Sequence, residues 1–119
     1  MADSITLKGM RFFAYHGLLP AEREQGQEIV VDVVLETDLR PAGQSDELTD
    51  TVDYRQAYDV ARGVIEGPPH NLLESMAEEI AHRLLALERV AAVTVSVRKP
   101  HVKFPGPLDH SEITIRRER

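Results

Sequence analysis

The sequence NLLESMAEEIAHRLLALERVAAVTVSVRK, residues 71–99, carries the two clearest secondary-structure patterns of the chain. Its apolar residues first recur at the three- and four-residue spacing that predicts a helix with one buried face. They are Leu73, Met76, Ala77, Ile80, Leu84 and Leu87. Over Ala92–Lys99 valines alternate with polar residues, and a spacing of two predicts a strand. This stretch therefore indicates a helix followed directly by a strand.

The residues outside this stretch predict one more helix and three more strands. The strands are expected at Ile5–Tyr15, Glu28–Leu39 and Ser111–Arg116, which are rich in alternating apolar residues. In the first strand the alternation changes phase near Gly9, which indicates a bulge. The other helix is expected to begin near Asp53, because Gln56 follows at the spacing of an approximate capping box. Residues 40–51 and 101–110 are polar or rich in Pro and Gly and are expected to be loops.

This order of elements predicts an α+β fold of the form ββααββ. A four-stranded antiparallel sheet would carry both helices on one face. At 119 residues the chain is long enough for one hydrophobic core and too short for two, so we expect a single domain over residues 1–119. The sheet would have two unpaired edges, and closing several subunits into a ring removes them. The fold therefore provides a physical motive for a homo-oligomer.

The composition excludes several classes of protein. The chain has no cysteine, which rules out disulfides, thiolate metal sites and cysteine nucleophiles. Its 20 acidic and 14 basic residues give a net charge of -6, which disfavours nucleic acid as a partner. No apolar run approaches the roughly 20 residues that cross a bilayer. We therefore expect a cytoplasmic protein with neither a membrane nor a nucleic-acid partner.

Four short motifs stand along the chain. They are YHGLLPAEREQGQ at 15–27, SDELTDTVDY at 45–54, NLLES at 71–75 and RKP at 98–100. In this order and at this spacing they resemble the dihydroneopterin aldolase family, and the similarity extends from Ile5 to Arg116. The resemblance implies the tunnelling fold, in which the antiparallel sheets of neighbouring subunits close into a β-barrel ring. It also implies that two rings stack, usually as an octamer, with a pterin site between adjacent subunits.

The same resemblance implies a lyase of folate biosynthesis. The family splits 7,8-dihydroneopterin by retro-aldol cleavage into 6-hydroxymethyl-7,8-dihydropterin and glycolaldehyde. The reaction needs a base for a side-chain hydroxyl and a sink for the released electrons. The ring C=N of the substrate is conjugated with the breaking bond and can be that sink. The resemblance therefore implies no cofactor, no metal ion and no Schiff base.

The family's functional residues carry over to Glu22, Tyr54, Leu73, Glu74 and Lys99 of this chain. Glu74 would bind the amino-pyrimidine edge of the pterin through two charge-assisted hydrogen bonds, assisted by backbone groups at Leu73. Lys99 would act as general base and then general acid through a water molecule. Tyr54 would reach the substrate from the neighbouring subunit and help protonate the intermediate. Glu22 would hold the side-chain hydroxyls or order the catalytic water.

Two of these residues have an equally concrete structural interpretation. Glu74 follows Asn71 at the spacing of a capping box, in which its carboxylate would bind the start of its own helix. Lys99 has the parity of Val95 and Val97 and would share their face of the strand. A lysine at a strand end before a proline is, however, usually a solvated charge.

The other two side chains also fit ordinary roles. A tyrosine at a helix start, such as Tyr54, is typical of a half-buried packing residue, and Glu22 fits an exposed loop acid. His16, in the first motif, is interpreted as structural, with an imidazole that fixes the turn before Gly17 by hydrogen bonding.

The loop after Pro100 departs from the family pattern. The family more often continues with a small apolar stretch such as Ala-Pro-Ile, whereas this chain has HVKF at 101–104. Lys103 places a second amine near Lys99 in the sequence, and we expect it to point to solvent.

Other functions fit parts of the same pattern. An epimerase of dihydroneopterin or its triphosphate, or an oxygenase of the same fold, would share the deprotonated intermediate, although no arginine cluster for a triphosphate is visible. A zinc enzyme of this architecture, as in pyruvoyl-tetrahydropterin synthesis, needs several histidines with a His-x-His pair. The five histidines here are scattered singly. A pterin- or purine-binding ring without turnover would be indicated by loss of Lys99 or Tyr54, and both are present.

Overall fold

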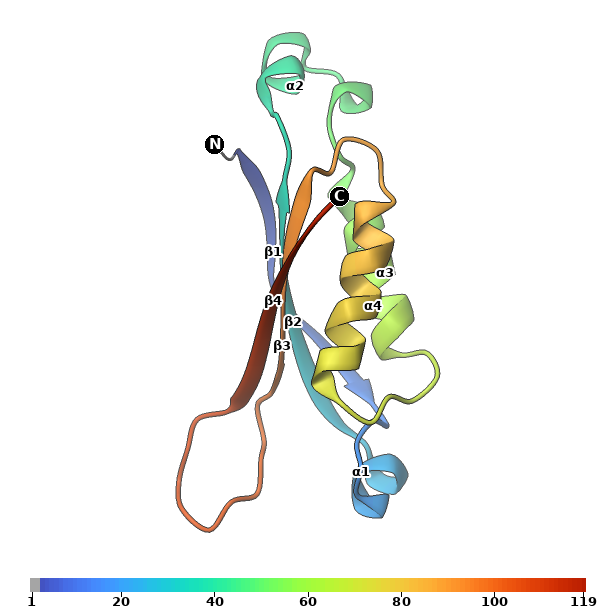
Figure 1. Ribbon diagram of the computed structural model, residues 1–119, viewed down its shortest axis with the longest axis vertical. Helices are drawn as coiled ribbons and strands as arrows, with labels where there is room; N and C mark the ends of the chain where they lie inside the picture. Colours follow the sequence, from blue (N-terminus) through green and yellow to red (C-terminus); the bar gives the residue numbers. More distant parts are fainter. Residues whose placement is uncertain (1–2) are drawn as a thin grey trace.

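The computed structural model describes residues 3–119 as a four-stranded antiparallel sheet with two long helices on one face (Figure 1). The strands are β1 (Ser4–Ala14), β2 (Gln27–Glu36), β3 (Ala92–Lys99) and β4 (Ser111–Glu118). They lie in the order β1-β2-β3-β4, and each pairs antiparallel with its neighbour. The predicted α+β fold and the order of its long elements are therefore confirmed.

Helices α3 (Tyr54–Ile65) and α4 (Leu73–Leu85) cover the same face of the sheet (Figure 1). The start of α3 is as predicted, because the side chain of Asp53 accepts a hydrogen bond from the Arg55 N–H at 3.1 Å. Gln56, the expected side-chain partner in this cap, instead donates its backbone N–H to the Asp53 carbonyl at 2.9 Å. Within residues 3–119 no helix is both long and apolar enough to span a membrane.

The core lies between these helices and the inner face of the sheet. Alternate residues of the two central strands are completely buried on this face: Ile29, Val31, Val33, Leu35, Val93, Val95 and Val97. The apolar face predicted for α4 packs against them, with Leu73, Met76, Ala77, Ile80 and Leu84 each at most 8% exposed. Burying one large aliphatic side chain contributes about 2 kcal/mol. The core therefore fixes which strand residues face the helices.

Short helical segments lie in connections where the sequence predicts loops. They are α1 (Pro20–Gln25), α2 (Arg40–Ser45) and the 3-10 turn η1 (Leu48–Asp50). None of them contains a buried residue, so they have no apolar periodicity to indicate a helix. The second predicted strand also ends at Glu36 rather than Leu39, because Leu39 is already the N-cap of α2.

Gly9 marks a bulge in β1, as predicted. The pairing with β2 shifts register between Leu7 and Met10, and Gly9 has a φ of 72°. Its N–H donates to Asp32 Oδ1 at 2.6 Å, and Asp32 also accepts a hydrogen bond from Arg98 at 2.7 Å. A left-handed backbone in the middle of a strand favours glycine, which has no Cβ to strain.

The molecule is elongated, with extents of 52 × 27 × 21 Å, and its two ends carry different segments (Figure 1). One end holds α1, the connection between α3 and α4, and the long loop between β3 and β4. The other end holds α2, η1 and the first residues of α3. Because α3 and α4 run in opposite directions, their N-termini lie at opposite ends of the molecule.

We predict that Gly9→Ala destabilises the fold by roughly 1 kcal/mol, because alanine in a left-handed conformation is strained even where space is free. Gly43→Ala is the matched control. A Cβ would meet no atom within 4 Å at either position, but only Gly9 has a positive φ, while Gly43 lies in α2. The control variant is expected to be neutral or slightly stabilised. Urea unfolding of the two variants compares them, and equal changes in unfolding free energy would refute the argument.

Candidate active site

A cavity of about 410 Å³ opens at the end of the molecule that carries α1. It lies between α1, the start of α4, the end of β3 and the start of β4. Its lining includes Leu19, Glu22, Leu73, Glu74 and Lys99. The structure therefore brings together four of the five residues that the resemblance indicates, from segments that are far apart in the sequence.

Lys99 is the last residue of β3 and lies on the inner face of the sheet. It follows Val95 and Val97 with the same parity, as predicted, and its side chain is 19% exposed. Its Nζ donates to Glu22 Oε2 at 2.6 Å. A charge next to an apolar layer is costly unless it is paired. For the Lys99 amine the paired group is the Glu22 carboxylate, on α1.

Glu22 is held by three donors. Besides the Lys99 amine, its carboxylate accepts the Leu19 N–H at 3.2 Å and the Gln27 amide at 3.1 Å. Burial alone would raise the pKa of Glu22, but these hydrogen bonds outweigh it and lower the pKa below its usual value. The group is therefore ionised at neutral pH. Gly17 leaves space for the Glu22 carboxylate, since a Cβ at position 17 would clash with it.

Glu74 stands in the first turn of α4 and is exposed. The capping box predicted as its alternative role is absent, because the N-cap is Leu72 and makes no side-chain hydrogen bond. Within residues 3–119 no donor binds the Glu74 carboxylate, and the Asn71 amide oxygen accepts a hydrogen bond from Arg23 instead. The first N–H groups of a helix have no carbonyl partner within it. The carboxylate and the Leu73 N–H are thus both free to bind a ligand.

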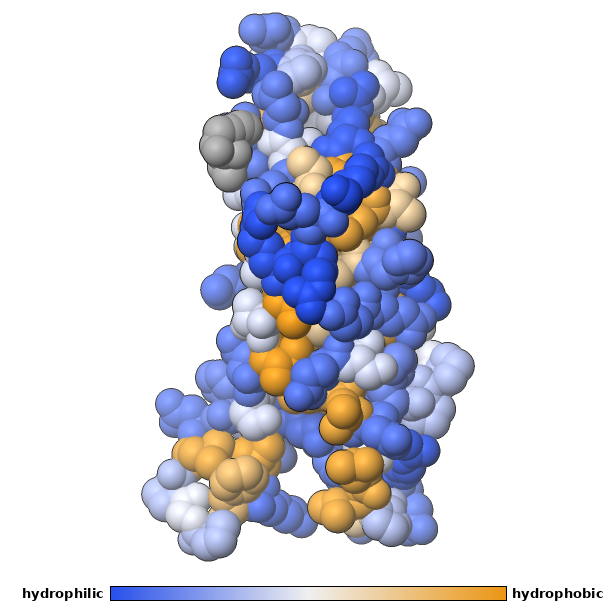
Figure 2. Space-filling model, viewed as in Figure 1, coloured by the Kyte–Doolittle hydropathy of each residue, from blue (hydrophilic) through white to orange (hydrophobic). Residues whose placement is uncertain are grey.

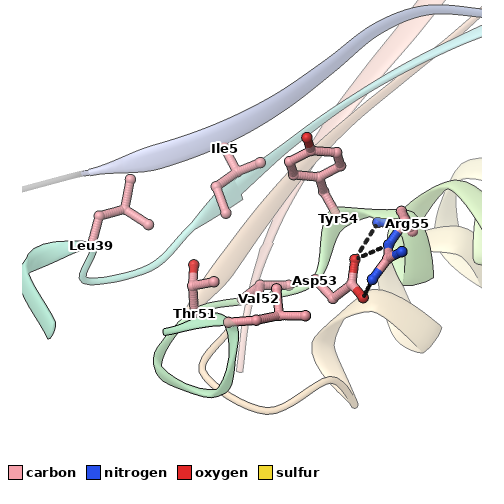
Figure 3. Close-up of a pocket in the computed structure, with 8 residues that line it drawn as sticks. Ile5, Leu39, Thr51, Val52, Asp53, Tyr54 and Arg55 are labelled. Atoms are coloured by element: carbon pink, nitrogen blue, oxygen red, sulfur yellow. Dashed lines mark hydrogen bonds and ion pairs between the residues drawn. The ribbon is translucent and has the colours of Figure 1, made fainter. Parts of the chain in front are cut away.

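Tyr54 does not join this cavity. It is the first residue of α3, is 55% exposed, and lines a separate cavity of about 520 Å³ at the opposite end (Figure 3). That cavity is formed by apolar residues such as Ile5 and Val52, with Asp53 and Arg55 at its side. The length of α3, roughly 18 Å for its 12 residues, separates Tyr54 from the connection that leads to α4. A single chain therefore does not bring Tyr54 to Glu74 and Lys99.

His16 is a buried structural residue, as predicted from the sequence. Its ring is 1% exposed, its Nε2 bonds to the Ile65 carbonyl at 2.6 Å, and its Nδ1 accepts the His70 N–H at 2.8 Å. The Gly17 N–H donates to the His70 carbonyl at 2.9 Å. These bonds tie the turn after β1 to the connection between α3 and α4. Burial lowers the pKa of His16 below its ordinary value, and an acceptor role for Nδ1 requires the neutral ring.

Two residues that support the site are not singled out by the sequence. Gln27 bridges the carboxylate of Glu22 and the carbonyl of His16, at 3.1 and 3.2 Å. Arg23 contacts Asn71 at the start of α4. Both lie inside the first motif, YHGLLPAEREQGQ, and that membership is the only signal in the sequence. Lys103 is exposed, in agreement with the expectation that it points to solvent.

Exposed apolar side chains lie at the end of the molecule that carries the cavity, and Leu18, Leu19 and Leu72 among them line it. Figure 2 shows two orange groups at the lower end of the molecule, one where the β3–β4 loop projects and one where α1 projects, with a gap between them. The exposed residues there include Leu18, Leu19, Leu72, Phe104 and Leu108. Within the described residues no three His, Asp or Glu side chains stand close enough to hold a metal ion.

Comparisons with known proteins agree on one family. The family model FolB, dihydroneopterin aldolase, matches residues 5–116. A dihydroneopterin aldolase of Staphylococcus epidermidis is 44% identical over 119 residues, covering 99% of this chain and 98% of its own length.

Solved structures show the same fold. The E. coli dihydroneopterin aldolase in complex with neopterin superimposes with a TM-score of 0.89 at 25% identity, covering 97% of this chain and 98% of that one. A Burkholderia dihydroneopterin aldolase bound to guanine has a TM-score of 0.82 at 26% identity, covering 99% and 92%.

The buried ring of His16 makes the fold sensitive to mild acid. The pKa of His16 in the folded state lies below the ordinary value of about 6.5. The contribution of the neutral ring to the folding free energy is therefore fully present above that pH. This contribution is lost as the pH falls from about 6.5 through the lowered pKa of the folded state. We predict a smaller free energy of unfolding by urea at pH 5.5 than at pH 7.5. NMR titration of the His16 ring assigns the effect, and a midpoint at or above 6.5 would contradict it.

Proposed function

The chain belongs to the dihydroneopterin aldolase family, and we propose that it cleaves 7,8-dihydroneopterin into 6-hydroxymethyl-7,8-dihydropterin and glycolaldehyde, a step of folate biosynthesis. The observation that carries this proposal is the convergence of Glu22, Glu74 and Lys99 on one cavity. In this proposal the three side chains supply an acidic anchor and a group for proton transfer to a single small molecule. Because the chain lacks cysteine and a long apolar run, we place this reaction in the cytoplasm.

We propose that Glu74 and Leu73 bind the pterin ring. A pterin presents a ring N–H and an exocyclic amine side by side, and a carboxylate accepts both in parallel hydrogen bonds. The Glu74 carboxylate is exposed and has no other donor in the described residues, and it stands next to the free N–H groups of the first helical turn. Neopterin and guanine, which relatives bind, share this amino-pyrimidine edge.

The pair of Glu22 and Lys99 would then face the side chain of the substrate. A base removes the proton of the hydroxyl on the second side-chain carbon, and that carbon becomes the aldehyde of glycolaldehyde. The electrons of the broken carbon–carbon bond move into the ring C=N. A proton delivered to the first side-chain carbon then gives the hydroxymethyl product. Lys99, acting through a water that Glu22 orders, is the proposed base and acid, and the substrate itself provides the electron sink.

Tyr54 is the proposed donor that helps protonate the intermediate, and it would come from a neighbouring subunit. Within one chain it lies at the far end from Lys99, which supports a site divided between two copies. The unpaired edges of β1 and β4 lie on opposite sides of the sheet, so copies pairing edge to edge would close a ring. We propose a tetrameric ring, stacked in pairs as an octamer. Stacking would also cover the exposed apolar residues around the cavity.

We predict that Lys99→Ala lowers the rate of glycolaldehyde release by roughly a hundredfold or more, the usual contribution of a general base. Neopterin binding should stay within a few-fold, because the ring is held by Glu74. Lys103→Ala is the matched control, since its amine is exposed and lies in the adjacent loop. Both are assayed with dihydroneopterin in excess chelator. A wild-type protein that requires added zinc would contradict the metal-independent mechanism, and epimer without glycolaldehyde would indicate an epimerase.

A second prediction tests the divided site. Tyr54→Phe and Lys99→Ala are each expected to lose most of the aldolase activity alone. In rings assembled from equal amounts of both, about a quarter of the sites combine an intact lysine with an intact neighbouring tyrosine. Aldolase activity should return to about that fraction of the wild-type value. Native mass spectrometry confirms that mixed rings have formed, and mixed rings as inactive as the single variants would show that both residues act within one chain.

A further inference from the structure

Arg23 connects the two walls of the cavity without lining it. It stands next to Glu22 on α1, and its side chain extends toward the start of α4. Its Nε donates to the Gly17 carbonyl at 2.7 Å, and its guanidinium also donates to the amide oxygen of Asn71. Asn71 lines the cavity just before Leu73 and Glu74.

Apolar packing does not hold α1 in this position. The helix has no buried residue, so its place relative to α4 depends on hydrogen bonds. The bonds of His16 and Gly17 to residues 65 and 70 fix the turn that precedes α1. Arg23 extends this connection from α1 itself to the residue at the mouth of the cavity.

Arg23 therefore joins the two segments that carry the carboxylates which a substrate must reach, those of Glu22 and Glu74. Glu74 is on the α4 side, whereas Glu22 is on α1, paired with Lys99 at 2.6 Å. A flexible link would let the two walls move apart. A ligand that touches only the Glu74 wall would not be affected by that movement, whereas a ligand that spans the cavity would lose contacts.

We propose that Arg23 is a positioning residue that sets the separation between the ring anchor at Glu74 and the Glu22–Lys99 pair. It thereby favours pterins with a hydroxylated side chain over bare rings. This inference rests on the proposed function of the cavity, because it uses the assignment of Glu74 to the ring and of Glu22 to the side chain.

The test compares neopterin, which carries the hydroxylated side chain, with guanine, which offers only the ring edge. Calorimetry of Arg23→Met should show neopterin binding weakened about tenfold, because its side-chain hydroxyls would lose about one charge-assisted hydrogen bond to Glu22 when the walls separate. Guanine binding should be unchanged within twofold. In turnover of dihydroneopterin the variant should show a raised KM. Arg23→Lys, which can reach only one of the two acceptors, should fall between.

Arg62→Met is the matched control, because Arg62 is another exposed arginine, on α3, and the substitution removes its ion pair with Glu66. It should bind both ligands as the wild type does. Equal weakening of neopterin and guanine by Arg23→Met would show a merely structural role and overturn the inference, as would no weakening of either. A wild-type protein that binds neither ligand would instead refute the proposed function of the cavity.

Discussion

The site depends on the alternation of side chains along β3, which places the Lys99 amine on the same face of the sheet as a layer of buried valines. Val93, Val95 and Val97 must point to the helices to form the core, so Lys99 points the same way at the strand end. The helices do not cover the sheet fully there, because α4 begins at Leu73. An unpaired ammonium beside this apolar layer would be costly. The carboxylate of Glu22 offsets that cost, because α1 holds it within hydrogen-bonding distance of the Lys99 amine.

The same geometry explains why one chain contains only part of the proposed site. The start of α4, the end of β3 and α1 meet at one end of an elongated molecule, whereas the start of α3 lies at the other (Figure 1). The antiparallel arrangement of α3 and α4 makes this separation unavoidable, since one helix must begin where the other ends. Two unpaired sheet edges and the exposed apolar residues at the end that carries α1 provide surfaces through which a second copy could bring its Tyr54 to the cavity.

Periodic and local features of this fold could be predicted from the sequence. The valine alternation of β3, the apolar face of α4, the phase change at Gly9 and the cap at Asp53 are each determined by neighbouring residues. The short helix α1 could not be predicted, because it buries nothing. Contacts between distant segments leave no periodic trace either. The Glu22–Lys99 pair joins residues 77 positions apart. Arg23 donates to the Asn71 oxygen, which the alternative capping-box interpretation would have used as a helix cap. Motif resemblance, rather than residue spacing, indicated Glu22, Glu74 and Lys99.

A crystal structure of the protein with neopterin bound would test the proposed pterin site most directly. We expect the amino-pyrimidine edge on the Glu74 carboxylate and the Leu73 N–H, with the side-chain hydroxyls toward Glu22 and Lys99. The Tyr54 hydroxyl of a neighbouring subunit should lie beside the ligand. Neopterin bound with its ring edge away from Glu74, or held in the Tyr54 cavity of a single chain, would contradict the proposed site.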